Sequence, residues 1–171
     1  GPLAGRLLGE RVLPDGATVS IAHSLMRCAE VEFAFRMGAP LAPRDHPWTV
    51  DEVMAAVATL HPAIELPDSR YRDFTVVGAP QLIADDACAD WFLLGAPAPD
   101  GWRALDLVEH PVLAVKNGTD ERRGRGGNAL GDPRIALTWL VNELSGIGVT
   151  LHAGEVVTTG TCLVPVEIEP G

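Results

Sequence analysis

Apolar and polar residues alternate most regularly between Cys28 and Met37. In this stretch positions 31, 33 and 35 hold valine or phenylalanine, and Glu30 and Glu32 occupy the alternate positions. Side chains two residues apart on a β-strand point to the same face. The stretch therefore predicts a strand with one apolar face and one acidic face.

Shorter apolar runs, bounded by glycine, proline or charged residues, predict further strands. They cover Val19–Ala22, Ala63–Leu66, Phe74–Val77, Trp91–Leu94, Val112–Lys116, Glu155–Thr159 and Leu163–Ile168. The run that ends at Lys116 meets Asn117 and Gly118, both of which adopt positive φ at little cost. A tight hairpin is predicted there.

A first helix is predicted from Asp51 to about Leu60, ahead of Pro62. Thr49 and Glu52 form a capping-box pattern at its start, in which each side chain bonds the backbone of the other residue. Proline cannot continue a helix, so we expect the helix to end before Pro62.

A second helix is predicted from Pro133 to about Leu144. Asp132 can cap its first turn, proline suits that turn, and Gly146 suits its exit. The pattern between residues 79 and 89 permits either a helical turn or an ordered loop.

The chain has 171 residues, of which 47% are apolar, and this is enough for a domain with a hydrophobic core. The predicted strands outnumber the helices and do not alternate with them regularly. This order favours an α+β or mainly β roll over a doubly wound parallel sheet. We therefore expect a single α+β domain spanning residues 1–171.

A formal net charge of -10 restricts the range of partners. Nucleic acids and anionic membrane surfaces repel an acidic chain, so neither is expected to bind. A basic cluster of Arg122, Arg123 and Arg125 lies among glycines. It is interpreted as a solvated loop rather than as an anion site.

The number and spacing of the cysteines indicate the cellular compartment of the protein. Cys28, Cys88 and Cys162 are odd in number and widely spaced, which fits neither a disulfide framework nor a zinc site of paired cysteines. No apolar run is long enough to span a bilayer, and the sequence does not open with a signal-peptide pattern. These features favour a reducing, cytoplasmic location.

Glu30 and Glu32 are the first candidates for chemistry. On one strand face they lie roughly 6.5–7 Å apart along the chain, so both carboxylates can bind one hard cation such as Mg2+, Mn2+ or Ca2+. A solvent-facing strand with two ordinary glutamates is the plain alternative. Glu65 favours the metal, because a carboxylate among apolar neighbours needs a partner. Arg70, across the next turn, is the rival partner for Glu65.

Several longer motifs follow one another along the chain. Residues 29–35 read AEVEFAF, residues 62–70 read PAIELPDSR, residues 83–87 read IADDA, and residues 128–133 read NALGDP, followed by Trp139-Leu140 and Thr159-Gly160-Thr161. In order and spacing, the set resembles the fumarylacetoacetate hydrolase superfamily, in its branch of 2-keto-4-pentenoate hydratases and 4-oxalocrotonate decarboxylases. The likeness extends over nearly the whole chain.

The resemblance implies that Glu30, Glu32 and Glu65 are the carboxylate ligands of one Mg2+ or Mn2+. It also implies a mixed β-sandwich roll with a few short helices, and homo-oligomers are common in the family. A 2-oxo acid can chelate such an ion through its keto and carboxylate oxygens, and the ion then stabilises an enolate or dienolate.

The implied activity is the hydration of a 2-hydroxy-2,4-dienoate, a small 2-keto-4-pentenoate-like substrate of aromatic breakdown. Decarboxylation of the 4-oxalocrotonate type and hydrolysis of a C–C bond are the alternatives within the superfamily, because the same stabilised intermediate serves all three reactions.

Two polar residues are candidates for further roles in the site. Asp85 is a candidate for a polar contact or a proton relay, and its alternative role is to cap a helical turn. Thr161 is a candidate for a hydrogen bond to the substrate carboxylate, and its alternative role is to satisfy the end of a strand.

Departures from the family pattern bear on activity. Asp86, Ala87 and Cys88 stand where hydratases have asparagine followed by small hydroxylated residues, which changes the substrate contacts expected from that loop. The N-terminal Gly-Tyr-Lys-type motif of the branch, with its lysine, and the final pair of strands have no counterpart in the sequence. A non-catalytic metal-binding or oligomer-forming partner is therefore the alternative outside the enzyme class.

Overall fold

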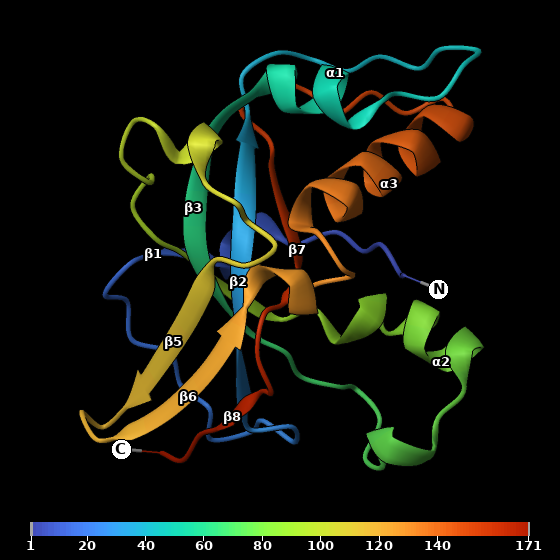
Figure 1. Ribbon diagram of the computed structural model, residues 1–171. Coiled ribbons are helices and arrows are strands. Elements are labelled where there is room, and N and C mark those ends of the chain that lie inside the picture. Colours follow the sequence, from blue (N-terminus) through green and yellow to red (C-terminus); the bar gives the residue numbers. More distant parts are fainter. Residues whose placement is uncertain (1, 171) are drawn as a thin grey trace.

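The computed structural model describes residues 2–170 and is built around one sheet (Figure 1). Its strands are β1 (Val12–Pro14), β2 (Cys28–Met37), β3 (Val57–Leu66), β4 (Trp91–Leu94), β5 (Pro111–Lys116), β6 (Asp120–Arg125), β7 (Val156–Thr161) and β8 (Val166–Glu167), and its α-helices are α1 (Val50–Ala56), α2 (Ala79–Ala84) and α3 (Pro133–Gly146). The main sheet has the order β1-β4-β3-β2-β7, and β8 pairs with β2 off this path. β5 and β6 form a separate hairpin.

β2 and β3 pair antiparallel at the centre of the sheet. Glu30 lies opposite Glu65, and Glu32 lies opposite Ala63. Side chains of directly paired residues point to the same face and lie close together. This register brings the acidic positions of the two strands to one place.

The face of the sheet that carries Phe33 and Phe35 forms the main hydrophobic core. Phe35 is fully buried, and Val53 of α1 and Leu137 of α3 belong to the same cluster. Both helices therefore cover this face, α3 as the long helix beside β2 and β7 in Figure 1. Full burial of one such side chain contributes roughly 1.5–3 kcal/mol.

The opposite face carries the two glutamates of β2 and a smaller apolar cluster. Ala34, Ala63 and Phe92 are buried there, and Leu7 of the N-terminal segment packs against them. The acidic positions therefore lie directly beside a small buried apolar cluster on the same face. No helix described between residues 2 and 170 has the length and apolar character needed to cross a bilayer.

Much of the predicted pattern is confirmed. β2 and β4 have the predicted bounds, and β5 and β6 form the predicted hairpin, with positive φ at Asn117 and Gly118. α3 begins at Pro133 as predicted, with the side chain of Asp132 accepting a hydrogen bond in its first turn, and it extends through Gly146. The mixed sheet with a few short helices confirms the α+β class.

The first predicted helix is wrong in its second half. The capping box is present, but α1 covers only Val50–Ala56, and the chain continues as β3 from Val57 through Pro62. Val57 and Leu60 have helical spacing, yet both pair with β2 in the sheet. Pairing along a ten-residue strand outweighs this local preference.

Three other expectations are corrected. The predicted strand Phe74–Val77 contains a 3-10 turn at Phe74–Val76, and the predicted strand Val19–Ala22 is irregular. Neither run pairs with a strand in the described part of the chain. β1, which was not expected, is only three residues long and ends in proline, so its pattern was too short to detect. The three clustered arginines lie in β6 rather than in a loop.

Candidate metal centre

Three carboxylates meet on the acidic face of β2 and β3. Glu30 lies directly opposite Glu65, and Glu32 follows two residues further along β2. One oxygen from each of the three lies within 4.8 Å of the others. The structure thus brings together the three residues that were predicted as metal ligands.

Burial makes these carboxylates hard to ionise. Burial, and then the charges of Glu32, Glu30 and Asp86, raise the pKa of Glu65 to about 8. Burial and the neighbouring Glu32 raise the pKa of Glu30 to about 7. Glu32 is only 2% exposed, and burial raises its pKa although hydrogen bonds oppose the shift. A cation among the three favours their ionised forms.

The two oxygens of Glu32 have different surroundings. Oε2 accepts hydrogen bonds from the hydroxyl of Thr158 and from the amide of Gly160, the latter at 3.0 Å. Oε1 is buried and has no hydrogen-bond partner among residues 2–170. An unpartnered buried acceptor costs about 1–3 kcal/mol, and more when it is charged. A bound cation satisfies such an oxygen.

The donor set fits a hard divalent cation. All three groups are carboxylates, and the cluster includes no histidine or cysteine from the described residues. Oxygen donors suit Mg2+, Mn2+ or Ca2+ rather than Zn2+ or Cu2+. No ion pair formed within residues 2–170 involves these glutamates. Arg70, the rival partner of Glu65, pairs with Asp85 instead.

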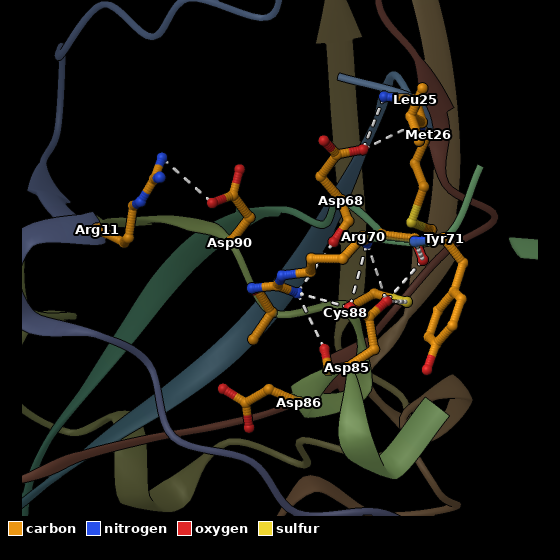
Figure 2. Close-up of polar contacts among 12 residues, drawn as sticks. Arg11, Leu25, Met26, Asp68, Arg70, Tyr71, Asp85, Asp86, Cys88 and Asp90 are labelled. Atoms are coloured by element: carbon orange, nitrogen blue, oxygen red, sulfur yellow. Dashed lines mark hydrogen bonds and ion pairs between the residues drawn. The ribbon is translucent and has the colours of Figure 1, made fainter. Parts of the chain in front are cut away.

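Asp85 belongs to a separate polar cluster (Figure 2). Its carboxylate accepts hydrogen bonds from the Ser69 hydroxyl at 2.6 Å and from the Arg70 amide at 3.1 Å. Burial raises the pKa of Asp85, but these hydrogen bonds and the Arg70 charge outweigh burial, so the pKa lies below its ordinary value. Asp85 is therefore an ionised anchor between two loops.

Arg70 holds the segment that follows Asp85 in an unusual conformation. Residues 86–88 have φ values of 54°, 54° and 65°, in the left-handed region that costs non-glycine residues of order 1 kcal/mol each. The guanidinium of Arg70 donates to the carbonyl of Asp85 at 2.9 Å and to that of Ala89 at 2.7 Å (Figure 2). These two bonds clamp both ends of the strained turn.

Asp86 is a fourth acidic residue, outside the cluster of three carboxylates, whose charge acts on Glu65. Its Oδ1 accepts a hydrogen bond from the Arg6 amide at 3.0 Å, which ties the N-terminal segment to the turn. Its charge contributes to the raised pKa of Glu65. From the sequence, Asp86 was identified only as a departure from the asparagine of the family. Its effect on Glu65 depends on the fold and was not predicted.

Thr161 lies beside the centre, opposite Glu32 in the pairing of β2 with β7. Its hydroxyl donates to the carbonyl of Leu163 at 2.8 Å. A contact from Thr161 to a substrate carboxylate stays a prediction. Thr158 and Gly160, which do bond Glu32, were not expected from the sequence, because strand alternation alone does not place both of them there.

A hollow of about 370 Å3 has Ser24, Cys28, Asp68 and Arg70 among its lining residues, and none of the three glutamates lines it. Cys28 lies two residues before Glu30 on β2, and burial and the charge of Glu30 raise the pKa of its thiol to about 11. The volume suits a small molecule.

Comparisons with known proteins show which proteins the chain is similar to. A 2-keto-4-pentenoate hydratase from Burkholderia vietnamiensis is 31% identical over 159 residues, which are 93% of this chain and 59% of the relative. The chain spans about three fifths of the length of the curated relatives it matches. No family model matches the sequence.

Solved structures extend the comparison. 4-Oxalocrotonate decarboxylase from Pseudomonas putida G7, complexed with magnesium and adipate, has a TM-score of 0.86 and 29% identity, over 98% of this chain and 62% of that one. A candidate fumarylacetoacetate isomerase/hydrolase from Oleispira antarctica has a TM-score of 0.59 and 17% identity, over 94% of this chain and 70% of that one. The second likeness concerns the fold alone.

Proposed function

We propose that the chain belongs to the 2-keto-4-pentenoate hydratase and 4-oxalocrotonate decarboxylase branch of the fumarylacetoacetate hydrolase superfamily, whose hydratases and decarboxylases it resembles, and that it forms the metal-binding core of an enzyme for 2-oxo acids. The favoured reaction is the hydration of a 2-hydroxy-2,4-dienoate. The observation that carries this proposal is the cluster of Glu30, Glu32 and Glu65, with its buried unpartnered oxygen.

The three glutamates would hold Mg2+ or Mn2+, with Glu32 using its free Oε1. When bound, such an ion polarises the keto oxygen of a 2-oxo acid and stabilises the enolate form. The hollow is proposed to take the carbon chain of the substrate, because its lining residues Cys28 and Leu66 lie on β2 and β3, close in sequence to the glutamates. Thr161, at the edge of the centre, is proposed to bond the substrate carboxylate.

Asp85 is proposed to hold neighbouring residues in place rather than to transfer a proton. Both of its carboxylate oxygens are engaged by Ser69 and Arg70, so it has little capacity left to move a proton. Its contribution is to fix the turn that carries Asp86, which in turn sets the negative charge beside Glu65.

Decarboxylation of a 4-oxalocrotonate-type substrate is the second candidate. It is favoured by the likeness to the decarboxylase of Pseudomonas putida G7, which was solved with adipate, a dicarboxylate. The two reactions differ in their substrates, because only a dienoate with a second carboxylate can release CO2 in this way.

Turnover measurements separate these reactions. The purified chain with Mg2+ is given 2-hydroxypenta-2,4-dienoate or the 2-oxo form of 4-oxalocrotonate, and dienoate absorbance and CO2 are followed. A hydratase consumes the first substrate without CO2, whereas a decarboxylase releases CO2 from the second. Both activities require the ion and are lost in Glu65→Gln. Bound metal without turnover of either substrate would refute the enzyme proposal and favour a non-catalytic metal-binding partner.

The proposal includes a cytoplasmic, homo-oligomeric protein. The support is the family resemblance and the three cysteines, which are free thiols in the structure. Light scattering of the purified chain tests the assembly, and a monomer at micromolar concentration would contradict it.

A further inference from the structure

β7 is irregular where it passes Glu32. Glu32 pairs with Thr161, but Ala34, two residues on, pairs with Thr158, so β7 holds one extra residue in this interval. Gly160, inside the irregularity, has a φ of 97°, which only glycine adopts without strain. Such a bulge re-aims the groups of one strand toward its neighbour.

The bulge directs two donors at one atom. The Thr158 hydroxyl and the Gly160 amide both bond Oε2 of Glu32, and Oε1 is left without a partner among the described residues. A donor bonded to a carboxylate oxygen competes with a cation for the same lone pairs. Glu32 therefore presents a single free oxygen to the centre.

The number of free oxygens bears on which ion fits. Ca2+ takes six to eight oxygens at roughly 2.3–2.6 Å and often binds a carboxylate through both oxygens, whereas Mg2+ requires six oxygens at roughly 2.0–2.1 Å. A carboxylate restricted to one oxygen suits the smaller, six-coordinate ions. We propose that Thr158 is a positioning residue that makes Glu32 a one-oxygen ligand and so favours Mg2+ or Mn2+ over Ca2+. This inference rests on the proposed metal site.

A merely structural role for Thr158 predicts a different outcome. If the hydroxyl only compensates the buried charge of Glu32, its loss weakens the binding of every cation by a similar factor. A positioning role changes the ratio of affinities, because freeing Oε2 helps Ca2+ more than it helps a small ion.

Four chains test the inference: the unmodified protein, Thr158→Val, Thr158→Ser and Thr159→Val. Thr159 is a matched control, because its hydroxyl lies in the same bulge but donates to the Phe33 carbonyl at 3.0 Å rather than to Glu32. Mn2+ affinity is measured by the electron paramagnetic resonance of free Mn2+, and Ca2+ affinity by competition with Mn2+.

Thr158→Val is expected to lower the preference for Mn2+ over Ca2+ by about tenfold, in the range usual for groups that orient a metal ligand. Thr158→Ser, which keeps the hydroxyl, and Thr159→Val are expected to keep the preference of the unmodified protein. An unchanged ratio in Thr158→Val would overturn the inference while the metal site stands. A failure of the unmodified protein to bind Mn2+ would instead refute the proposed function, and this inference with it.

A second measurement does not depend on the folding of a variant at position 158. Infrared difference spectra of the unmodified protein, with Mg2+ against metal-free, report the separation of the two carboxylate stretches. The band of Glu32 is identified by comparing the unmodified protein with Glu32→Gln, both metal-free. A widened separation indicates binding through one oxygen and is expected. A narrowed separation indicates binding through both oxygens and would contradict the inference.

Discussion

Glu32→Gln separates the metal role of Glu32 from its effect on folding. Glutamine keeps the acceptor that Thr158 and Gly160 bond, but places a neutral NH2 group where the unpartnered Oε1 lies. That group can donate to Glu30, whose pKa is raised in part by the adjacent Glu32. We expect the metal-free variant to be more stable than the metal-free parent, although it loses its metal affinity.

The magnitude follows from what the substitution removes. A buried acceptor without a partner costs about 1–3 kcal/mol, so the free energy of unfolding should rise by a similar amount. For a chain of this length each kcal/mol corresponds to roughly 2–4 °C, so the Tm should rise by about 2–12 °C. The affinity for Mn2+ should fall by more than the 10–100-fold that is typical for the loss of a group behind the ligands.

Thermal unfolding, followed by circular dichroism in EDTA and in Mn2+, measures both effects. The parent should gain stability from Mn2+, and Glu32→Gln should start higher and gain little. Glu32→Ala serves as the control, because it also removes the charge but leaves Thr158 and Gly160 without an acceptor, and its Tm should fall. A metal-free Glu32→Gln less stable than the parent by 1 kcal/mol or more would refute the reasoning.

Three further results are expected. The contribution of Glu30 and Glu65 to the stability of the metal-free protein should be fully present below pH 4.5 and should be lost as the pH rises through 7 and 8. Their folded pKa values of about 7 and about 8 exceed the ordinary 4.5, so the folded state holds more protons than the unfolded state in this range. Urea unfolding between pH 5.5 and 8.5 checks this, and a rising free energy of unfolding over that range would contradict it. Asp85→Ala should lower the free energy of unfolding by about 2–3 kcal/mol, because it leaves the Ser69 hydroxyl and the Arg70 amide without their acceptor. Urea unfolding measures the loss, and a change below 0.5 kcal/mol would show that the cluster is not needed for stability. Arg70→Lys should speed amide exchange in the turn after Asp85, because lysine cannot clamp both carbonyls; exchange as slow as in the parent would argue against the clamp.

The acidic face was predictable from the sequence because it depends on a short-range rule. Alternation along β2 separates Glu30 and Glu32 from the phenylalanines, and this is what the structure has. The meeting with Glu65 depends on the register of β2 with β3. Local pattern could not fix that register, and the family resemblance supplied the expectation.

Other features could not be predicted because they depend on tertiary partners. The residues from Val57 to Leu60 have helical spacing, and only pairing with β2 makes them a strand. Thr158 and Gly160 reach one oxygen of Glu32 through a bulge that the pattern of β7 does not encode. The position of Asp86 beside Glu65 depends on the left-handed turn that Arg70 clamps.

The most direct test of the metal centre is Mn2+ binding by the purified chain, by calorimetry or electron paramagnetic resonance, with and without oxalate as a mimic of the 2-oxo acid head group. Glu65→Gln is measured beside it. The account predicts one Mn2+ per chain, tighter binding with oxalate, and loss of binding in the variant. No Mn2+ binding, or equal binding in Glu65→Gln, would contradict the assignment of the three glutamates as a metal site.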